Sequence, residues 1–376
     1  MTKIIFIAKT NLNNDGRILN QIKILQNKFK ENLNLHFLLL PDKPFKDNLG
    51  KGVTIHNLDT SSRRNKFLRP FTVIEFTYKS LKKLSELKPS IIHVQDFAVV
   101  LPVYLYKKFI NNKVIIIYDD HEMPNENESL QYKFLQLFER KLMKLANIVI
   151  YANQERQEIL DKELRLNNSS YFLNLPYFDK ELSSDLNDIE SHYAEHLRQL
   201  QNLKSTGSRL IIHQGLLEVE RGREKLANFS KLNLLDTKIV IIGISEVDFK
   251  VFIDEFNLDI DNFYFVGSVP YNILSKFWEI GNAAIIMYLP TFINNRLCAP
   301  NRYFIALKLA LPTIVNIDNP VLFNLTEKYS SGFYIENIKT TEDLEDVIKH
   351  KYYVNTLEDL KNEEIRKFES IYENYI

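Results

Sequence analysis

Solid apolar segments alternate with helical patterns along almost the whole chain, and this alternation constrains the fold more than any other feature. One series of such segments covers 4–8, 35–40, 91–94, 114–118 and 148–151; a second covers 210–213, 238–242, 264–266, 283–287 and 313–315. Strands that are apolar at every position are buried on both faces. The alternation therefore predicts an α/β fold of parallel sheets covered by helices on both sides.

The alternation is interrupted once, by the polar and charged stretch 179–208, which ends in Lys-Ser-Thr-Gly-Ser. We interpret 179–208 as a linker region that contains one exposed helix at 186–203. A chain of 376 residues is long enough for two domains. We expect two Rossmann-like, doubly wound domains, over 1–178 and 209–355, which face each other across a cleft. The segment 356–376 has the pattern of an amphipathic helix.

Bulk composition excludes several classes of protein. With 45% hydrophobic and 26% charged residues and zero net charge, the chain is typical of a soluble globular protein that has no general attraction to nucleic acid. The single cysteine, Cys298, excludes an intrachain disulfide and fits a reducing compartment. The short apolar run before Lys9 indicates a first strand rather than a signal peptide, and no run approaches the roughly 18 apolar residues of a membrane span. We therefore expect a cytoplasmic protein.

The segment 61–90 is locally basic, with eight Lys and Arg residues against two Glu. Aromatic residues are interleaved with these charges, among them Phe67, Phe71 and Tyr78. Such a mixture predicts peripheral contact of residues 63–88 with an anionic membrane or a lipid-phosphate acceptor. A solvated helix face is the alternative.

The stretch 299–315 combines a tight polar turn, a helix and a buried strand. Pro300 suits the first turn of a helix, where its missing N–H costs nothing, and Asn301 and Arg302 follow it. Unpaired N–H groups at a helix start favour an anion such as phosphate. This stretch predicts a nucleotide site in the C-terminal half, whereas ordinary dinucleotide enzymes carry theirs in the first strand–helix turn.

Further candidate residues follow other strands of the C-terminal half. Gly215 and Gly243 come at strand ends, where a missing side chain allows the backbone to approach a ligand. Arg221 and Arg223 follow Gly215, and arginine neutralises a diphosphate with bidentate geometry. A strand–loop–helix junction with solvated arginines is the alternative. The turn 266–271 would form either the floor of a base pocket or a simple turn.

Polar residues also close two strands of the N-terminal half, in 93–96 and 118–122. Strand ends of this kind form binding sites in α/β domains. His121 would bond a sugar hydroxyl or a reacting centre, or else cap the backbone of its loop. We discount a metal at Asp119 and Asp120, since adjacent residues of an extended segment point apart. The first strand–helix turn carries neither Gly-x-Gly-x-x-Gly nor a Walker loop, which argues against NAD-type binding and a P-loop ATPase.

Taken in order, these motifs resemble those of the two-domain GT-B glycosyltransferases, in particular the retaining, nucleotide-sugar-dependent family four. The resemblance extends over nearly the whole chain. Its elements are Asp15-Gly16-Arg17, Ile91-Ile92-His93-Val94-Gln95-Asp96, Tyr118-Asp119-Asp120-His121-Glu122, Glu139-Arg140, Gln214-Gly215 with Arg221-Gly222, and Pro300-Asn301-Arg302-Tyr303-Phe304.

The resemblance implies a division of labour. The C-terminal domain would hold the nucleotide sugar and the N-terminal domain the acceptor, with the last helix packing back on the N-terminal domain. His121 would lie near the transferred sugar, and Arg221 would stabilise the diphosphate leaving group, so these two are the expected catalytic residues. The expected donor-binding residues are Gly215, Arg223, Gly243, Ser268, Val269, Pro300, Asn301 and Arg302; those on the acceptor side are Asp15, Arg17, His93, Asp96, Asp120 and Glu122. No metal and no cofactor are expected.

The chain departs from the family pattern at three positions. Two glutamates, eight positions apart, mark the family, and here Leu297 and Ile305 take their places. Leu216 stands where the family has a first basic residue. From the resemblance as a whole we expect a glycosyltransferase of bacterial surface polysaccharide synthesis that acts on a glycan or lipid-linked acceptor. A catalytically impaired scaffold of another transferase is the alternative, and a sugar-nucleotide epimerase is disfavoured because the second domain lacks a pair of acid–base carboxylates.

Overall fold

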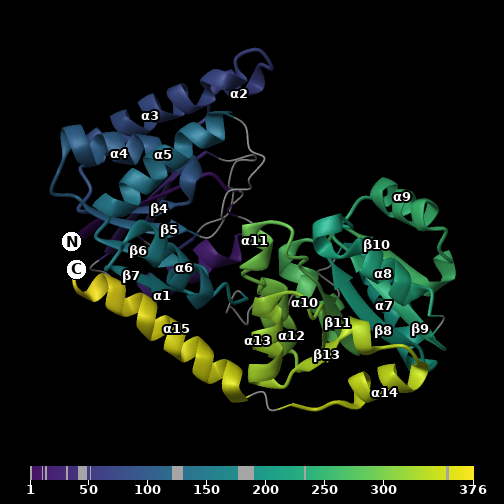
Figure 1. Ribbon diagram of the computed structural model, residues 1–376. Coiled ribbons are helices and arrows are strands. Elements are labelled where there is room, and N and C mark those ends of the chain that lie inside the picture. Colours follow the sequence, from purple (N-terminus) through teal and green to yellow (C-terminus); the bar gives the residue numbers. More distant parts are fainter. Residues whose placement is uncertain are drawn as a thin grey trace. The chain divides into compact units, whose positions relative to one another are not determined.

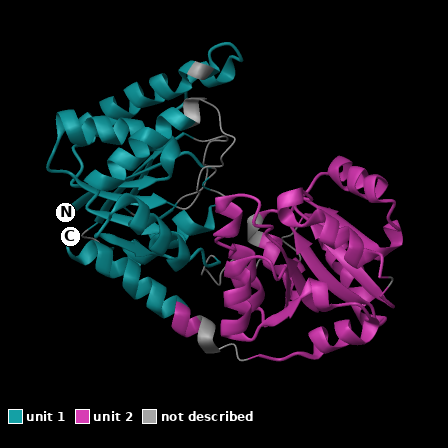
Figure 2. Ribbon diagram, in the orientation of Figure 1, with its two compact units in different colours: residues 1–177, 361–376 teal, residues 178–360 magenta. Residues whose placement is uncertain are grey.

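A computed structural model describes the chain except for residues 1, 11, 13–14, 31–32, 41–48, 51, 121–129, 177–189, 233 and 353–354, and the side chains of 70, 130–132, 271–272 and 355–357. It divides into two compact units (Figures 1 and 2). Unit 1 comprises 1–177 and 361–376, and unit 2 comprises 178–360. The final residues of the chain thus belong to the same unit as the first.

Unit 1 is a seven-stranded parallel sheet of order β3-β2-β1-β4-β5-β6-β7. Its strands are β1 (Thr2–Ala8), β2 (Leu33–Leu39), β3 (Val53–Asn57), β4 (Ile91–Gln95), β5 (Ile115–Asp120), β6 (Ile148–Tyr151) and β7 (Ser169–Tyr171). Its helices are α1 (Gly16–Phe29), α2 (Ser61–Arg64), η3 (Arg69–Phe71), α3 (Thr72–Leu87), η4 (Phe97–Val99), α4 (Val100–Leu105), η5 (Tyr106–Ile110), α5 (Leu130–Leu145) and α6 (Gln154–Leu164). The last helix, α15 (Asn355–Glu373), contributes its C-terminal part to unit 1.

Helices cover both faces of this sheet, which explains the apolar runs of its inner strands. On one face, Phe76 of α3, Val103 of α4 and Leu142 of α5 pack in one hydrophobic cluster. On the other face, Ile22 of α1 and Phe368 of α15 pack in a second cluster. Burial of one such side chain stabilises the fold by about 1.5–3 kcal/mol, so α15 is a component of the unit 1 core.

Unit 2 repeats this design with a six-stranded parallel sheet of order β10-β9-β8-β11-β12-β13. Its strands are β8 (Arg209–Gln214), β9 (Thr237–Ile242), β10 (Phe263–Gly267), β11 (Ala283–Ile286), β12 (Thr313–Val315) and β13 (Gly332–Tyr334). Its helices are α7 (Ser191–Ser205), η8 (Val219–Arg221), α8 (Arg223–Ser230), α9 (Glu246–Phe256), η9 (Ile260–Asn262), α10 (Tyr271–Glu279), α11 (Ile293–Arg296), α12 (Asn301–Lys308), α13 (Pro320–Tyr329), η10 (Ile335–Asn337) and α14 (Thr341–Lys349). Helices α8, α9 and α14 pack on one face through residues such as Leu226, Phe252 and Leu344.

The expected α/β class with two Rossmann-like parallel sheets is confirmed, and every expected strand is present. Three further strands, β3, β7 and β13, were not expected. They lie at sheet edges, where half-exposed side chains replace the solid apolar run of an inner strand. Residues 191–205 form helix α7, which is part of unit 2 and buries Ala194, Leu197 and Leu200. No helix in the described parts of the chain is both long and apolar enough to cross a bilayer.

Candidate functional site

The strand order of unit 2 reverses between β8 and β11, because β9 and β10 lie on one side of β8 while β11, β12 and β13 lie on the other. In open parallel sheets, ligands bind at the carboxyl ends of the strands next to such a reversal. Here the strand ends are followed by Gly215 after β8 and by Tyr288 shortly after β11. The residues around these two positions form the candidate site.

Arg302 reaches this point from the first turn of α12. Its Nη1 donates a hydrogen bond to the carbonyl oxygen of Gln214, the last residue of β8. Its guanidinium carbon lies 5.1 Å from the centroid of the Tyr288 ring, and the side chain is 9% exposed. This hydrogen bond joins the start of α12 to the end of β8, and the expected anion site at this helix start stays a prediction.

Arg221 reaches the same tyrosine from the loop that follows β8. Its guanidinium carbon lies 4.2 Å from the Tyr288 ring centroid. The Tyr288 backbone is held by Asn316, whose Oδ1 accepts from the Tyr288 N–H at 2.9 Å and whose Nδ2 donates to the Tyr288 oxygen at 3.0 Å. Two cations thus share one fixed aromatic ring, and within the described residues neither guanidinium has a carboxylate partner. This leaves a concentrated positive charge that suits an anion.

His213 is the neighbour that sequence reasoning did not select. It is buried at the end of β8, and neither ring nitrogen has a hydrogen-bond partner among the described residues. Burial, with the adjacent charges of Arg302 and Arg221, lowers the pKa of His213 to about 3, so the imidazole is neutral at pH 7. Tyr288 was also missed. Its signal in the sequence is its place after a solid apolar strand, which many loop residues share.

Glycine is required at the first position after β8. Gly215 has φ +122°, which L side chains rarely adopt, and a Cβ there would lie 2.8 Å from Arg302 Nη1. The backbone of Gly215 also lies close to Gly243, whose added Cβ would be 3.5 Å from the Gly215 nitrogen. Two of the expected donor-side glycines are therefore brought together next to Arg302.

The other expected donor residues are spread around this point. Arg223 contacts α9: its Nη2 pairs with Glu255 Oε1 at 2.5 Å, and its guanidinium lies over the Phe256 ring. It therefore does not join Arg221 at the tyrosine. Ser268 and Val269 follow β10, an edge strand of the sheet, and Tyr193 of α7 donates to the Ser268 oxygen at 3.1 Å. Pro300 and Asn301 form the start of α12.

The two residues that replace the missing glutamates are apolar and buried. Leu297 is 3% exposed and Ile305 is 8% exposed. Cys298, beside Leu297, is buried, and its thiol donates to Asn319 Oδ1 at 3.6 Å. No carboxylate from these positions offsets the charge of Arg221 and Arg302. Across the described residues, no group of three or more His, Cys, Asp and Glu side chains is arranged to hold a metal ion.

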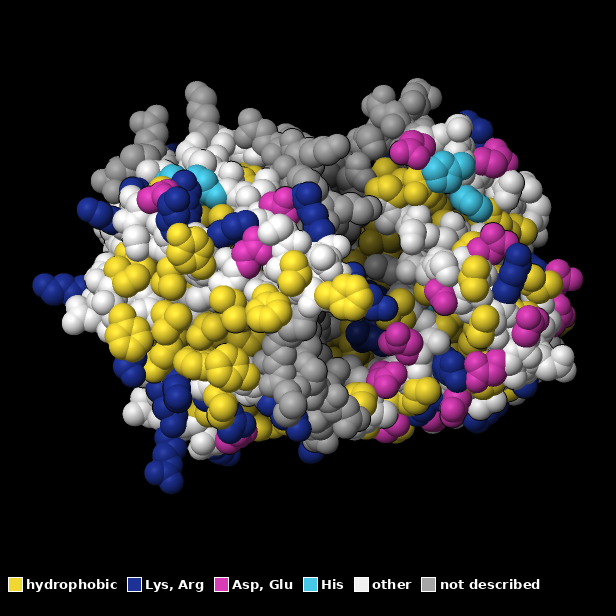
Figure 3. Space-filling model, turned by 90° about the horizontal axis from the view of Figure 1, so that it is seen from above, with side chains coloured by type: hydrophobic (Ala, Val, Ile, Leu, Met, Phe, Trp, Pro, Cys, Tyr) yellow, Lys and Arg dark blue, Asp and Glu magenta, His cyan; other side chains and the backbone are white. Residues whose placement is uncertain are grey.

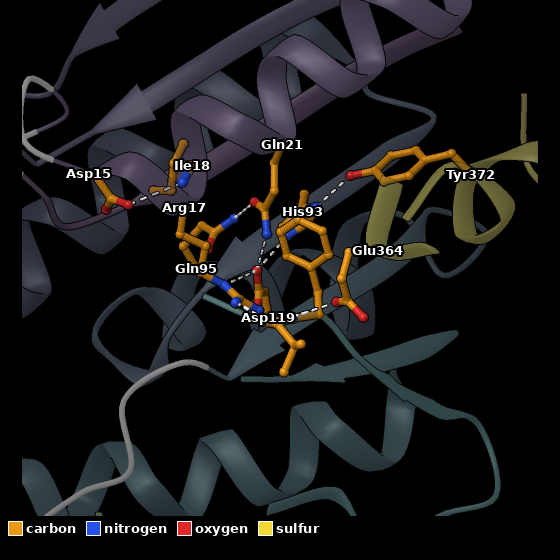
Figure 4. Close-up of polar contacts among 11 residues, drawn as sticks. Asp15, Arg17, Ile18, Gln21, His93, Gln95, Asp119, Glu364 and Tyr372 are labelled. Carbon is orange, nitrogen blue, oxygen red and sulfur yellow. Dashed lines mark hydrogen bonds and ion pairs between the residues drawn. The ribbon is translucent and has the colours of Figure 1, made fainter. Parts of the chain in front are cut away.

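In unit 1, several expected acceptor-side residues belong to a buried polar cluster (Figure 4). Arg17 pairs with both oxygens of Asp119, with Nη2–Oδ1 at 2.7 Å and Nε–Oδ2 at 3.2 Å. Its Nη1 donates to the Phe172 oxygen at 2.6 Å. Gln21 donates to Asp119 Oδ2 at 2.5 Å, and Gln95 donates to Gln21 at 2.8 Å. All of these polar side chains are at most 3% exposed.

His93 connects the same cluster to the last helix. Its Nδ1 lies 2.5 Å from the Tyr372 hydroxyl, and its Nε2 lies 3.5 Å from Asp119 Oδ2. Glu364, also on α15, accepts from the Leu173 N–H at 2.7 Å. Buried groups that bond to one another in this way stabilise the unit only as a complete set. The structure thus gives Arg17 and His93 a structural part in joining α1, the sheet and α15, and the acceptor contact expected of them stays a prediction.

Of the remaining acceptor-side residues that the structure describes, Asp15 lies at the start of a helix, and Asp96 and Asp120 lie at the ends of strands. Asp15 caps α1 by accepting from the Ile18 N–H at 3.1 Å. Asp96 follows β4 with φ +61°, the left-handed region. Asp120 is buried at the end of β5, where desolvation raises its pKa to about 6 against the opposing charge of Arg156. His121 and Glu122 lie outside the described residues.

Comparison with known proteins agrees with this architecture. No family model matches the chain. Over 267 residues it is 26% identical to the uncharacterized glycosyltransferase MJ1059 of Methanocaldococcus jannaschii, an alignment that covers 67% of this chain and 61% of that protein. The chain therefore spans less than two thirds of that relative's length.

Solved structures show the same fold at low sequence identity. Sucrose-phosphate synthase of Thermosynechococcus elongatus superposes with a TM-score of 0.66 at 12% identity, covering 99% of this chain and 100% of that one. HepE of Anabaena, in complex with UDP, superposes with a TM-score of 0.63 at 13% identity, covering 98% and 100%. The resemblance to GT-B-fold glycosyltransferases is thus confirmed, and membership of family four stays a prediction.

Proposed function

We propose that this chain is a glycosyltransferase that moves a sugar from a nucleotide-diphosphate donor to a glycan or lipid-linked acceptor. The observation that carries the proposal is the pair Arg221 and Arg302, which share the Tyr288 ring at the reversal point of unit 2 without a carboxylate partner among the described residues. The name of the archaeal relative and the UDP bound to HepE support a donor of this class. The setting in bacterial surface polysaccharide synthesis rests on the sequence resemblance.

The chemistry follows from where charge develops. When the bond between the sugar and the diphosphate breaks, negative charge accumulates on the leaving phosphate oxygens. Arg221 and Arg302 would bind these oxygens, with the first N–H groups of α12 beside them, and charge-assisted bonds of this kind stabilise the transition state more than the ground state. His213 stays neutral there and adds a hydrogen-bond donor without further charge.

The remaining roles are also part of the proposal. The acceptor hydroxyl would attack from the side of the leaving group, with a phosphate oxygen taking its proton, so that the anomeric configuration is retained. Unit 1 would bind the acceptor, and Asp96 and Asp120 at its strand ends are the candidate contacts. Transfer would need no metal, since the arginines bear the phosphate charge. His121 keeps its proposed place near the donor sugar.

Binding of nucleoside diphosphates tests the donor half of the proposal. We would measure the thermal shift given by UDP, GDP, CDP, ADP and dTDP, with EDTA and with Mg²⁺. A nucleotide at one hundred times its dissociation constant stabilises the fold by about 2.7 kcal/mol, which is several degrees. Arg221→Ala should abolish the shift. Arg198→Ala should retain it, because Arg198 is an exposed side chain of α7 that pairs with Glu195.

Transfer itself distinguishes the enzyme from the second candidate, a catalytically impaired scaffold of another transferase. The apolar, buried Leu297 and Ile305 favour this second candidate, since two carboxylates of the family are missing there. Hydrolysis of the matching nucleotide sugar, lost in Arg221→Ala, would support the enzyme. The absence of both hydrolysis and transfer would support the scaffold, and binding of no nucleotide would refute the enzyme.

A further inference from the structure

The outward face of α3 is apolar over its first two turns, where a surface helix is normally polar. Phe76 and Leu84 face the sheet and are buried. On the opposite side, Phe71, which precedes the helix, and Ile74 and Tyr78 are 55%, 64% and 68% exposed. Their spacing of three to four residues places them on one stripe.

The outward face of α5 mixes apolar and basic residues. Phe134 and Leu137 are 49% and 59% exposed, whereas Leu142 of the same helix is buried in the core cluster. Lys141 and Lys144 are exposed on the same side, one and two turns further along the helix. The exposed side chains described on this helix include no acid. A stripe of this composition is typical of helices that lie in the plane of a membrane interface.

Helix α4 lies between these two helices and connects their outer surfaces. It packs against both α3 and α5, and all three contribute to the same core cluster on one face of the unit 1 sheet. Ring contacts run from Tyr104 through Phe138 to Phe134, at 5.2 and 5.0 Å between centroids. Beyond α4, Phe109 is 70% exposed with the Lys108 ammonium 5.5 Å from its ring. Figure 3 shows hydrophobic side chains gathered on this part of unit 1, flanked by Lys and Arg.

The charges around this surface have one predominant sign. On α3 the acids are paired, Glu75 with Lys79 at 2.7 Å and Glu86 with Lys83 at 3.2 Å. Other exposed cations have no carboxylate partner among the described residues: Lys66, Arg69, Lys82, Lys133, Lys141 and Lys144. An occupant of this surface must therefore be apolar at its centre and anionic at its margin.

We infer that the outer surface of α3, η5 and α5, called here the α3–α5 surface, binds an anionic lipid bilayer. Lipid tails would accept the exposed aromatic and aliphatic side chains, while the lysines extend to the headgroups. A protein partner fits less well, because protein interfaces are depleted in lysine, and lysines are the main cations around this surface. The inference concerns unit 1 alone and does not depend on the transferase activity.

Sedimentation with lipid vesicles tests the charge half of the inference. The full chain should bind phosphatidylcholine vesicles that contain about 30% phosphatidylglycerol, and it should bind pure phosphatidylcholine far more weakly, with added salt reducing the difference. The combined variant Lys133→Gln, Lys141→Gln, Lys144→Gln should bind about a hundredfold more weakly, at about fivefold for each cation near the surface. The matched variant Lys250→Gln, Lys328→Gln, Lys349→Gln removes three exposed lysines of unit 2 and should bind as the wild type does.

A tryptophan probe tests insertion. The single native tryptophan, Trp278, is fully buried in unit 2 and gives a constant background. In Phe71→Trp, emission should shift to shorter wavelength with anionic vesicles and be quenched by brominated lipid. In the control Val247→Trp, on α9 of unit 2, the emission should neither shift nor be quenched, although Val247 is 70% exposed.

Three results would overturn the inference. Equal binding of neutral and anionic vesicles would remove the role of the lysines, and an unshifted probe at Phe71 would remove the role of the apolar stripe. A dimer without lipid that Phe71→Ser with Phe134→Ser makes monomeric would assign the surface to a second copy of the chain. All of these positions are exposed, so a loss of binding would not reflect misfolding.

Discussion

Replacing Asp119 by alanine should destabilise unit 1 far more than removing an exposed ion pair. Asp119 is fully buried and holds Arg17 through two hydrogen bonds, so the variant leaves a buried guanidinium without its counter-ion. Such a loss costs about 3–5 kcal/mol. At an m-value of about 2 kcal/mol/M in urea, the unfolding midpoint of unit 1 falls by about 1.5–2.5 M. Asp59→Ala breaks the exposed pair with Arg64 and should leave the midpoint almost unchanged.

The two units can be followed separately in this experiment. Far-UV circular dichroism reports both sheets and their helices, whereas Trp278 fluorescence reports unit 2 only. The Asp119 variant should lower the dichroism transition, and the double variant Arg17→Met, Asp119→Leu should recover much of the loss because it removes both charges. A midpoint change below about 0.5 M for Asp119→Ala would refute the reasoning, and Arg17 would again be a candidate for acceptor binding.

Two other predictions concern the candidate site of unit 2. Gly215→Ala should weaken binding of the nucleotide at least tenfold in calorimetry, since the added Cβ would lie 2.8 Å from Arg302 Nη1. Gly207 is the control: its φ is also positive, but an added Cβ would meet open space. Gly207→Ala should therefore lower stability without lowering affinity for the nucleotide. Because the pKa of His213 is lowered to about 3 from an ordinary value of 6.5, the unfolded chain takes up a proton first, and stability is lost as pH falls from about 6.5 towards 3. In urea titrations over this pH range, His213→Leu should lose less stability than the wild type as pH falls, by up to about 1.4 kcal/mol per pH unit. If the stability of both proteins had the same pH dependence, that result would contradict the burial of a neutral imidazole.

The sequence was sufficient to predict the parts of the fold whose pattern is local. Inner strands such as β1 and β8 are buried on both faces over most of their length, and this burial favours the apolar runs 4–8 and 210–212. Edge strands are only half buried, so β13, with the sequence Gly-Phe-Tyr, carries no such run. Pairing with a neighbouring strand decides its structure, and that pairing is not visible in the local pattern.

The candidate site was predicted less completely, because its residues come from distant segments. Arg221 and Arg302 were selected from their motifs, but the ring that brings them together, Tyr288, follows a different strand. Arg223 was selected on the same grounds as Arg221. Its pairing with Glu255 on α9 depends on how α8 and α9 pack, which spacing along the chain does not reveal.

The two units share one strand order but differ in how the arginines near the reversal of that order are compensated. In each sheet the strand order reverses beside the first strand of the unit, and α/β domains bind ligands next to such a reversal. In unit 1 an arginine at this level, Arg17, is buried and paired with Asp119, so its charge is compensated within the fold. In unit 2 the corresponding level holds Arg221 and Arg302 on an aromatic ring, with no carboxylate partner among the described residues. Since uncompensated cations are costly to hold together, their retention at the reversal point of unit 2 is best explained by an anionic ligand that completes the site.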